Sequence, residues 1–470
     1  MTEVKKKSQT SRSRQRIRLT EIAVTAGCVG FVGLFGIKYL IMPQLFKDKA
    51  AEKRTVTFNA ISDYVIEGDI KDADGNIICG NASPGESAVV PDAEAYSYAW
   101  LTGYYSVNSN KENAFGLRGN LKDYSLFNLD ENNKGATVTL TTNTELQNFC
   151  YDLLNGEEGS VIVLDNKTGA IKAFASQSTI DYNANDPTSI LRADVEGSQY
   201  RRGTYENDPP GSTFKVITSA AALKMKEDEN LDDSFFEYND TGDYNPVGSD
   251  FHIHNFDDQV WGQINLEQAL NNSVNTYFAN LGVNVGGERI KAMAEKFMIG
   301  KTIEIPFLTT ISSSMDLGDQ KPAIIAQTAF GQGNTQVTPM NMALAAQAIA
   351  NNGVMMRPYI VSDISQGMIP LYKFFPHKLS NVLDETVEAE LKRIMHSTAE
   401  GYGLTEERYG MVYAKTGTAE CANNRVHTYI IGFTKDAAFM ISKNNSDLSS
   451  RLWPAAGRLV TEINKVYQSE

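Results

Sequence analysis

The order of strand and helix signals along the chain limits the folds that it can adopt. Two apolar runs, residues 160–164 and 170–175, flank the turn Asp165–Gly169 and predict a β-hairpin. Further strand signals lie at 138–141, 411–414, 428–433 and 437–442, and helical patterns lie between them at 145–154, 214–223, 266–270, 276–281 and 339–350. We therefore expect an α/β (α+β) fold, in which one sheet pairs early strands with late strands and helices are inserted between them.

The N-terminus combines a basic tail with an apolar segment. Residues 1–19 contain seven Lys or Arg and one acidic residue, and Ile22–Met42 contains only Lys38 as a charged residue. Twenty-one such residues can cross a bilayer, and the basic excess favours the tail on the cytoplasmic side. We predict a cytoplasmic tail at 1–19, an uncleaved transmembrane signal anchor at 20–42, and a single-pass protein of the cell membrane with an extracytoplasmic catalytic domain. A cleaved signal peptide and a lipoprotein at Cys28 are the alternatives.

Residues 43–135 have a different texture from the remainder of the chain. Short strand-like runs, such as 64–70 and 76–79, are broken by Gly, Asn and Asp, as in the turn Asp72–Gly75. This region is too short and polar for a large core of its own. We predict a small, mostly-β pedestal at 43–135 that holds a domain at 136–470 away from the membrane.

Composition excludes several classes of function. The net charge of -14 argues against a nucleic-acid partner, which requires a basic face. The four cysteines, at positions 28, 79, 150 and 421, follow no metal-ligand spacing and allow at most one disulfide outside the apolar segment. We expect no cofactor and no metal.

His252 and His254, with Asp257 and Asp258, are the nearest approach to a metal motif, because alternate residues of a strand share one side. No third or fourth ligand is evident, which favours surface or packing histidines. Cys421 as a thiol nucleophile is also disfavoured, since no His-Asn pattern accompanies it.

The segment Pro209–Lys215 contains the first candidate catalytic pair. Two prolines and Gly211 lead into a helical run, and Ser212 and Lys215 are three residues apart, so that both lie on one face of a helix. A desolvated lysine loses its proton more readily and can act as a general base for the serine hydroxyl. The alternative is that Ser212 caps the helix and Lys215 lies in water.

Two later motifs add polar groups. Ser273 and Asn275 lie between two helical stretches, where a hydroxyl and an amide could point into one cavity. The alternative is a helix cap, and the same tripeptide recurs at 106–108. Lys415, Thr416, Gly417 and Thr418 follow the strand predicted at 411–414, where they could bind a carboxylate while Gly417 admits an extended substrate. Lys167–Gly169 repeats the tripeptide at a hairpin tip.

The order of these motifs is that of penicillin-binding proteins and class A β-lactamases. The chain resembles a class B penicillin-binding protein, the monofunctional peptidoglycan D,D-transpeptidase family. The likeness extends from about residue 136 to near the C-terminus and is carried by Gly159–Ala170, Asn265–Phe278, Gly331–Gly333 with Val337–Pro339, and Lys415–Glu420, and more weakly by 68–72 and 116–118. It implies a transpeptidase domain with a central antiparallel sheet flanked by helices.

The resemblance also implies roles for the candidate residues. Ser212 would attack a terminal D-Ala-D-Ala bond with Lys215 as base, and the backbone N–H groups of Ser212 and Thr418 would form the oxyanion hole. The other implied roles are proton transfer by Ser273, positioning of Lys215 and substrate by Asn275, and carboxylate binding by Lys415, Thr416 and Thr418. The implied partners are peptidoglycan stem peptides, β-lactams, the membrane and a SEDS-family glycosyltransferase.

Rival functions and departures from the family pattern remain. A D,D-carboxypeptidase or a β-lactamase of the same fold would pass the acyl group to water, and a non-catalytic β-lactam sensor or scaffold would not use Ser212. Glu206–Asp208 look like extra residues before the proline pair, and Glu67 stands where the family's pedestal usually has arginine. These departures affect the approach to the serine rather than the serine itself.

Overall fold

The structure is a computed structural model of the chain. It describes residues 66–80, 96–108, 111–125, 130, 132–177, 202–421, 425–444, 446 and 451–469. Within these residues, no helix combines the length and the apolar character that crossing a bilayer requires. The predicted anchor at 20–42 and the tail at 1–19 lie outside the described residues.

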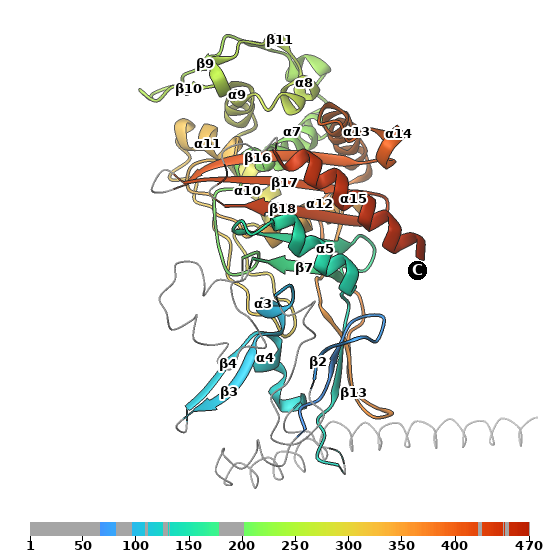
Figure 1. Cartoon of the computed structure of the whole chain (residues 1–470). Helices are drawn as coiled ribbons and strands as arrows, with labels where there is room; N and C mark the ends of the chain where they lie inside the picture. The colour runs from blue at the N-terminus through green and yellow to red at the C-terminus, as the bar shows by residue number, and fades with distance from the viewer. Residues whose placement is uncertain are drawn as a thin grey trace, which may run out of the picture. The chain divides into compact units, whose positions relative to one another are not determined.

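A five-stranded antiparallel sheet forms the centre of the larger part of the chain (Figure 1). Its order is β16-β17-β18-β6-β7, with β6 at Gly159–Asp165, β7 at Ile171–Ser176, β16 at Tyr413–Cys421, β17 at Arg425–Phe433 and β18 at Ala437–Lys443. The early hairpin thus joins the late strands through the pairing of β18 with β6. The predicted pairing of early with late strands is confirmed.

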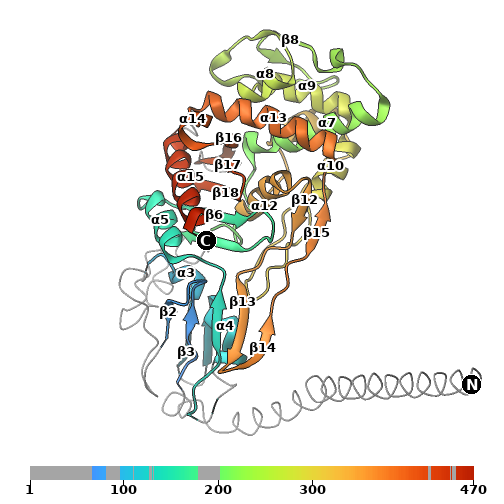
Figure 2. The same cartoon turned by 90° about the vertical axis from the view of Figure 1, so that its right-hand side faces the viewer.

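Both faces of this sheet are covered, which explains why its strands are apolar at successive positions. In β6, Val161 and Val163 pack towards α5 (Thr144–Leu154) and α15 (Leu452–Ser469), whereas Ile162 and Leu164 belong to the core that includes α12 (Pro339–Ala350). Figure 2 shows α5 and α15 on one side of the strands and α12 on the other. The alternation of the strand places each face in its own core.

A mainly helical region lies between β7 and β16 along the chain. It contains η3 (Gly211–Phe214), α7 (Lys215–Glu229), α8 (Leu266–Asn271), α9 (Asn275–Val285), α10 (Gly287–Lys296), α11 (Pro322–Ala329), α13 (Glu385–Gly401) and α14 (Glu406–Tyr409). Short strands between them pair as β8 (Tyr238–Asp240) with β11 (Gly262–Ile264), β9 (Asp243–Tyr244) with β10 (Ile253–His254), and β12 (Val354–Met356) with β15 (Lys378–Asn381). The 3-10 turns η4 (Asp233–Phe236) and η5 (Phe256–Asp258) complete this region.

The second large sheet joins distant parts of the sequence. Its order is β14-β13-β5-β1-β2, with β1 at Ile70–Lys71, β2 at Ile77–Cys79, β5 at Thr137–Leu140, β13 at Val361–Gln366 and β14 at Ile369–Lys373. The hairpin β3 (Tyr104–Asn108) and β4 (Lys111–Phe115) and the helices α3 (Ala99–Thr102) and α4 (Gly116–Ser125) come from the predicted pedestal. The boundary between 135 and 136 stays a prediction, and the sheet takes β5, β13 and β14 from beyond it.

The departure at Glu67 has a local structural explanation. Arg118, in α4, donates two hydrogen bonds to the Glu67 carboxylate, from Nε at 2.8 Å and from Nη2 at 2.6 Å. Both side chains are buried, with 5% exposure for Glu67 and 9% for Arg118. The acidic residue at position 67 therefore completes a buried bidentate ion pair.

Candidate active site

Ser212 lies in a tight 3-10 turn rather than in the first turn of an α-helix. The turn η3 spans Gly211–Phe214 and continues directly into α7, which begins at Lys215. Because residues three apart eclipse each other in a 3-10 helix, Ser212 and Lys215 still share one side. Ser212 is partly buried, whereas Lys215 is fully buried.

Two glycines allow this turn to form. Gly211 has φ of 55°, in the left-handed region that glycine enters without steric cost, and its N–H donates to the Gly331 carbonyl at 3.0 Å. A Cβ on Gly331 would lie 1.8 Å from the Gly211 oxygen. The Gly331–Gly333 stretch therefore supports the serine turn through a backbone contact that excludes any side chain.

Strand β16 packs against the same turn. A Cβ on Gly211 would lie 2.5 Å from the Thr418 carbonyl oxygen, and a Cβ on Gly417 would lie 2.9 Å from the Thr213 nitrogen. The predicted strand at 411–414 was placed too early, because β16 runs from Tyr413 to Cys421 and contains the Lys-Thr-Gly residues themselves. Pairing with β17 at every residue overrides the low strand propensity of Gly417.

A cluster of hydrogen bonds joins the three motifs. The Lys215 ammonium nitrogen donates to the Ser273 carbonyl at 2.7 Å, to the Ser273 hydroxyl at 3.2 Å and to Asn275 Oδ1 at 2.8 Å. Lys415, also fully buried, donates to the same Ser273 hydroxyl at 3.1 Å and to the Thr416 carbonyl at 2.9 Å. Ser273 therefore bridges two lysine amines that come from α7 and β16.

This arrangement changes the acid-base behaviour of Lys215. Burial lowers the pKa of the Lys215 amine well below its ordinary value, and the nearby charge of Lys415 lowers the pKa further. A lysine in such surroundings is available as a neutral amine, which can accept the proton of a neighbouring hydroxyl. The alternative interpretation, with Lys215 in water, is inconsistent with its complete burial.

The loop between α8 and α9 presents Ser273 in a strained conformation. Ser273 has φ of 54°, in the left-handed region, which is unfavourable for a residue other than glycine. Val274 occupies the N-cap of α9, and the first-turn N–H of Thr276 donates to Asn255 Oδ1 at 3.1 Å, so neither Ser273 nor Asn275 is observed to cap that helix. Asn275 is the first residue of α9, and its amide also donates to the His254 carbonyl at 3.1 Å.

A buried carboxylate that the sequence analysis did not identify supports this loop. Asp240, 1% exposed, accepts hydrogen bonds from the Thr276 hydroxyl at 2.6 Å, the Asn255 amide at 2.9 Å and the Trp261 backbone N–H at 2.8 Å. These bonds tie the segment around Asn255 to the start of α9. Nothing in the local sequence distinguishes Asp240 from the other acidic residues of this stretch.

The two threonines of β16 differ in their surroundings. Thr418 is exposed, whereas Thr416 is buried and its hydroxyl lies 3.0 Å from the hydroxyl of Tyr402. The Tyr402 hydroxyl also accepts a hydrogen bond from the Thr416 backbone N–H at 3.3 Å. Tyr402 follows α13 and was not identified from the sequence, which offers no motif around it. The predicted roles of Thr416 and Thr418 in carboxylate binding stay predictions.

The other candidate motifs have ordinary structural surroundings. Lys167 is exposed at the tip of the β6–β7 hairpin, where the Asp165 carboxylate accepts from the backbone N–H groups of Lys167 and Thr168. His252 Nδ1 lies 2.9 Å from the Asp243 carboxylate and His254 Nδ1 lies 3.6 Å from it. These two histidines thus pair with Asp243 and not with the predicted aspartates at 257 and 258.

A serine three residues before a buried lysine, a second serine that bridges two lysines, and a lysine-bearing strand are the groups expected of a serine acyltransferase site that uses lysine where other enzymes use histidine. A family model described as the penicillin binding protein transpeptidase domain matches residues 159–451. The chain belongs to this family of penicillin-binding transpeptidases.

Relatives cover most of the chain. This chain is 28% identical over 421 residues to the peptidoglycan D,D-transpeptidase PbpA of Mycolicibacterium smegmatis, and the match covers 80% of this chain and 82% of that protein. The crystal structure of PBPA from Mycobacterium tuberculosis superposes with a TM-score of 0.76 at 24% identity, covering 85% of this chain and 99% of that one. The D,D-transpeptidase domain of a peptidoglycan glycosyltransferase from Eggerthella lenta gives a TM-score of 0.74 at 26% identity, covering 86% and 100%.

Proposed function

We propose that this chain is a membrane-anchored serine D,D-transpeptidase that cross-links peptidoglycan stem peptides through an acyl-enzyme on Ser212 and is inhibited by β-lactams. The observation that supports this most directly is the Ser273 hydroxyl shared by Lys215 and Lys415. It joins a base for the serine, a path for a proton and a cation for a substrate carboxylate in one hydrogen-bonded group.

Acylation requires a base, a proton donor and two oxyanion donors. The Ser212 hydroxyl oxygen attacks the carbonyl of the D-Ala-D-Ala bond while Lys215 takes the hydroxyl proton. The backbone N–H groups of Ser212 and Thr418 stabilise the oxyanion of the tetrahedral intermediate, and each such donor typically accelerates the reaction by about 10²–10³-fold. The C–N bond then breaks, and the proton held by Lys215 reaches the departing D-alanine amine through the Ser273 hydroxyl.

Transfer to the acceptor reverses these proton movements. The amine of a neighbouring stem peptide attacks the Ser212 ester, loses a proton to the Lys215–Ser273 pair and forms the cross-linking amide. Ser212 leaves as the alcohol after regaining its proton. A β-lactam enters the first half of this sequence, because opening of its ring amide also gives an ester on Ser212.

Substrate orientation depends on β16. Lys415, Thr416 and Thr418 bind the terminal carboxylate of the donor peptide, with charge-assisted hydrogen bonds from the lysine. Gly417 carries no side chain, so an extended peptide can approach the strand closely. Asn275 holds both Lys215 and the peptide backbone of the donor.

The anchor and the protein partner are part of the same proposal. The apolar segment Ile22–Met42 follows a basic tail, as expected for a single-pass anchor with a cytoplasmic N-terminus. An enzyme held at the membrane surface can act beside a glycan-polymerising enzyme, and a SEDS-family glycosyltransferase is the partner proposed for this role.

Labelling of the full chain by a fluorescent penicillin tests the nucleophile. The wild type should form a covalent adduct that peptide mass spectrometry assigns to Ser212, and Ser212→Ala should not. Lys415→Ala should slow labelling, whereas Lys167→Ala, in the repeated tripeptide at the hairpin tip, should not. No adduct on the wild type, or an adduct that persists in Ser212→Ala, would reject the proposal.

The acceptor is tested by product analysis. With purified donor and acceptor muropeptides, the wild type should give cross-linked dimers in addition to free D-alanine. Hydrolysed donor without dimers would favour the D,D-carboxypeptidase alternative, and rapid release of opened β-lactam would favour a β-lactamase. Complementation of a deletion strain by Ser212→Ala would favour a scaffold.

A further inference from the structure

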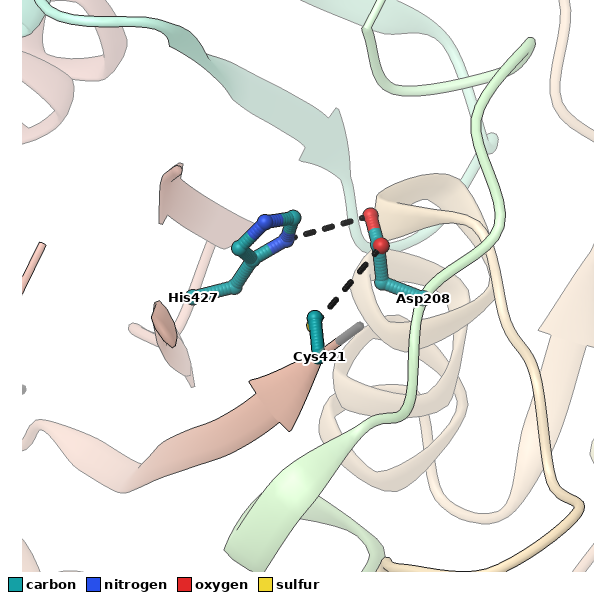
Figure 3. Close-up of side chains that lie close together, drawn as sticks. All are labelled: Asp208, Cys421 and His427. Atoms are coloured by element: carbon teal, nitrogen blue, oxygen red, sulfur yellow. Dashed lines mark hydrogen bonds and ion pairs between the residues drawn. The ribbon is translucent and has the colours of Figure 1, made fainter. Parts of the chain in front are cut away.

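Three side chains with metal-binding atoms meet beside the serine turn. Asp208 precedes the two prolines that lead to Ser212, Cys421 ends β16, and His427 lies near the start of β17 (Figure 3). One ligand atom from each residue lies within 4.8 Å of the ligand atoms of the other two. Among the described residues, this is the only such group of three or more His, Cys, Asp or Glu side chains.

The separations within the cluster match the edges of a zinc coordination sphere. His427 Nδ1 lies 3.3 Å from one Asp208 carboxylate oxygen, and Cys421 Sγ lies 3.9 Å from the other. Zinc bonds of about 2.0–2.3 Å in a tetrahedron place neighbouring ligand atoms about 3.3–3.6 Å apart. Binding through one carboxylate oxygen therefore requires only a small movement of Cys421 or Asp208.

Two buried side chains of the cluster region, His427 and Tyr429, have polar atoms without a hydrogen bond within the described residues. His427 is fully buried; its Nδ1 forms an ion-pair contact with Asp208 at 3.3 Å without hydrogen-bond geometry, and its Nε2 has no hydrogen-bond partner among the residues that the structure describes. Tyr429 lies two residues further along β17 and is 4% exposed, and its buried hydroxyl also has no hydrogen-bond partner among the described residues. Buried polar groups are normally hydrogen-bonded, so the absence of hydrogen bonds to the His427 ring and the Tyr429 hydroxyl leaves these atoms able to accept a further ligand.

We propose that Asp208, Cys421 and His427 form a binding site for a divalent metal ion of the zinc class, with the fourth position open to water or to the Tyr429 hydroxyl. A thiolate, an imidazole and a carboxylate are the ligands that zinc takes in proteins. Binding uses the Cys421 thiolate and the neutral His427 ring, so the protons that they release go to solvent. Cys421 and Asp208 are partly exposed, which gives the ion a route of entry.

The site would fasten the catalytic strand to the segment that carries the nucleophile. Asp208 lies four residues before Ser212, and Cys421 lies three residues after Thr418, whose backbone is proposed to bind the oxyanion. Asp208 is already held on one side by two backbone hydrogen bonds with Val337. A metal ion bound to all three side chains would fix the distance between the turn and β16, and metal binding itself does not depend on the proposed acyl transfer.

The two exposed histidines provide a matched control. His252 and His254 lie beside Asp243 and could collect an ion weakly, but their site has no thiol. Cobalt(II) distinguishes the two sites, because only the cluster containing Cys421 can give a sulfur-to-cobalt charge-transfer band.

The experiment uses the full chain in detergent, loaded with zinc and freed of excess metal, and cobalt titration under reducing conditions. The wild type and the double variant His252→Gln/His254→Gln should each retain one zinc per chain and give the charge-transfer band. Cys421→Ser should lose both, and Asp208→Asn should lose the retained zinc. Added zinc should raise the melting temperature of the wild type and not that of Cys421→Ser.

Several outcomes would overturn the proposal. These are a wild type that retains no zinc and gives no charge-transfer band, metal retention that is unchanged in Cys421→Ser, and metal that disappears only in the double histidine variant. Cys421 is partly exposed at a strand end, so its replacement by serine should leave the fold intact, and covalent penicillin labelling of that variant confirms that the site has folded.

Discussion

The Ser273 hydroxyl brings the Lys415 amine close enough to Lys215 for its positive charge to lower the pKa of Lys215. Both amines contact the Ser273 hydroxyl oxygen, at 3.2 Å and 3.1 Å, so the two nitrogens lie no more than about 6.3 Å apart. At an effective dielectric constant of about 20, two positive charges at this distance repel each other by about 2.6 kcal/mol. Replacing Lys415 by methionine removes this repulsion and retains most of the side-chain volume.

The expected result is a displaced pH profile for acylation. Lys215 must be neutral to accept the serine proton, so the rate is highest above its pKa and is lost as the pH falls through that pKa. Burial lowers this pKa and Lys415 lowers it further, so Lys415→Met should raise the pKa of Lys215 and move the acidic limb of the profile to higher pH.

The assay is the second-order rate constant for acylation by a chromogenic β-lactam, measured across the pH range. Loss of the carboxylate contact should lower the rate at every pH, whereas the change at Lys215 should move the limb, so the two effects are separable. Lys167→Met serves as the control and should reproduce the wild-type profile. A Lys415→Met profile that superposes on the wild type after scaling, or that moves to lower pH, would refute the electrostatic reasoning.

Three further predictions concern stability and the serine turn. Glu67→Gln should destabilise the chain by about 3 kcal/mol in denaturant unfolding, because the buried Arg118 guanidinium loses the Glu67 carboxylate. The double variant Glu67→Leu/Arg118→Met should recover most of that loss. A cost below about 1 kcal/mol in the single variant would contradict this prediction. Gly211→Ala should slow penicillin acylation by about 10²-fold, because φ is 55° and the new Cβ would clash with the Thr418 carbonyl, and an unchanged rate would be the opposite result. Lys215→Met should abolish acylation and remove a pH dependence of the unfolding free energy. A lysine whose pKa is lowered by folding opposes folding most strongly below its folded pKa. The stability of the wild type relative to the variant should therefore rise with pH, by up to about 1.4 kcal/mol per pH unit, until the ordinary pKa of lysine is reached. Parallel pH profiles of unfolding free energy would exclude that effect.

The sequence predicted the central sheet because its strands are marked locally. Apolar runs bounded by turns define β6, β7, β17 and β18 within two or three residues, and the pairing of early with late strands follows from their order. The end of β16 was less accurate, at 414 instead of Cys421, since Lys415 and Gly417 are poor strand residues in isolation. The strand is determined there by its partner, as the unbroken register with β17 shows.

The sequence did not predict the features that depend on long-range contacts. Ser273 is left-handed without being glycine, and its hydroxyl is held by two lysines that are distant from it in the sequence. Asp240 and Tyr402 belong to no motif, and their hydrogen bonds arise from segments that the chain order does not connect. These residues were missed because a spacing rule detects neighbours along a helix or strand and not neighbours through space.

The grouping of Asp208, Cys421 and His427 does not follow from the sequence, for the same reason. Its residues lie at positions 208, 421 and 427, which satisfies no local ligand spacing, and the antiparallel pairing of β16 with β17 brings the last two together. The extra residues Glu206–Asp208 supply the third member. Glu206 meanwhile accepts two hydrogen bonds from Arg202, so this departure from the family pattern has a structural role as well.

In the proposed mechanism, the second lysine close to Lys215 favours the neutral form that a base requires. Neither Lys215 nor Lys415 lies within ion-pair distance of a carboxylate among the described residues, so two buried amines share one hydroxyl without a compensating anion. Such a pair is unfavourable when both amines are charged, and the least costly arrangement leaves one of them neutral. The absence of a counter-ion thus favours the neutral form of Lys215, and in the proposed reaction the terminal carboxylate of the donor peptide supplies the missing negative charge beside Lys415. Stability that a carboxylate in the protein would have provided is instead available as binding energy for the substrate.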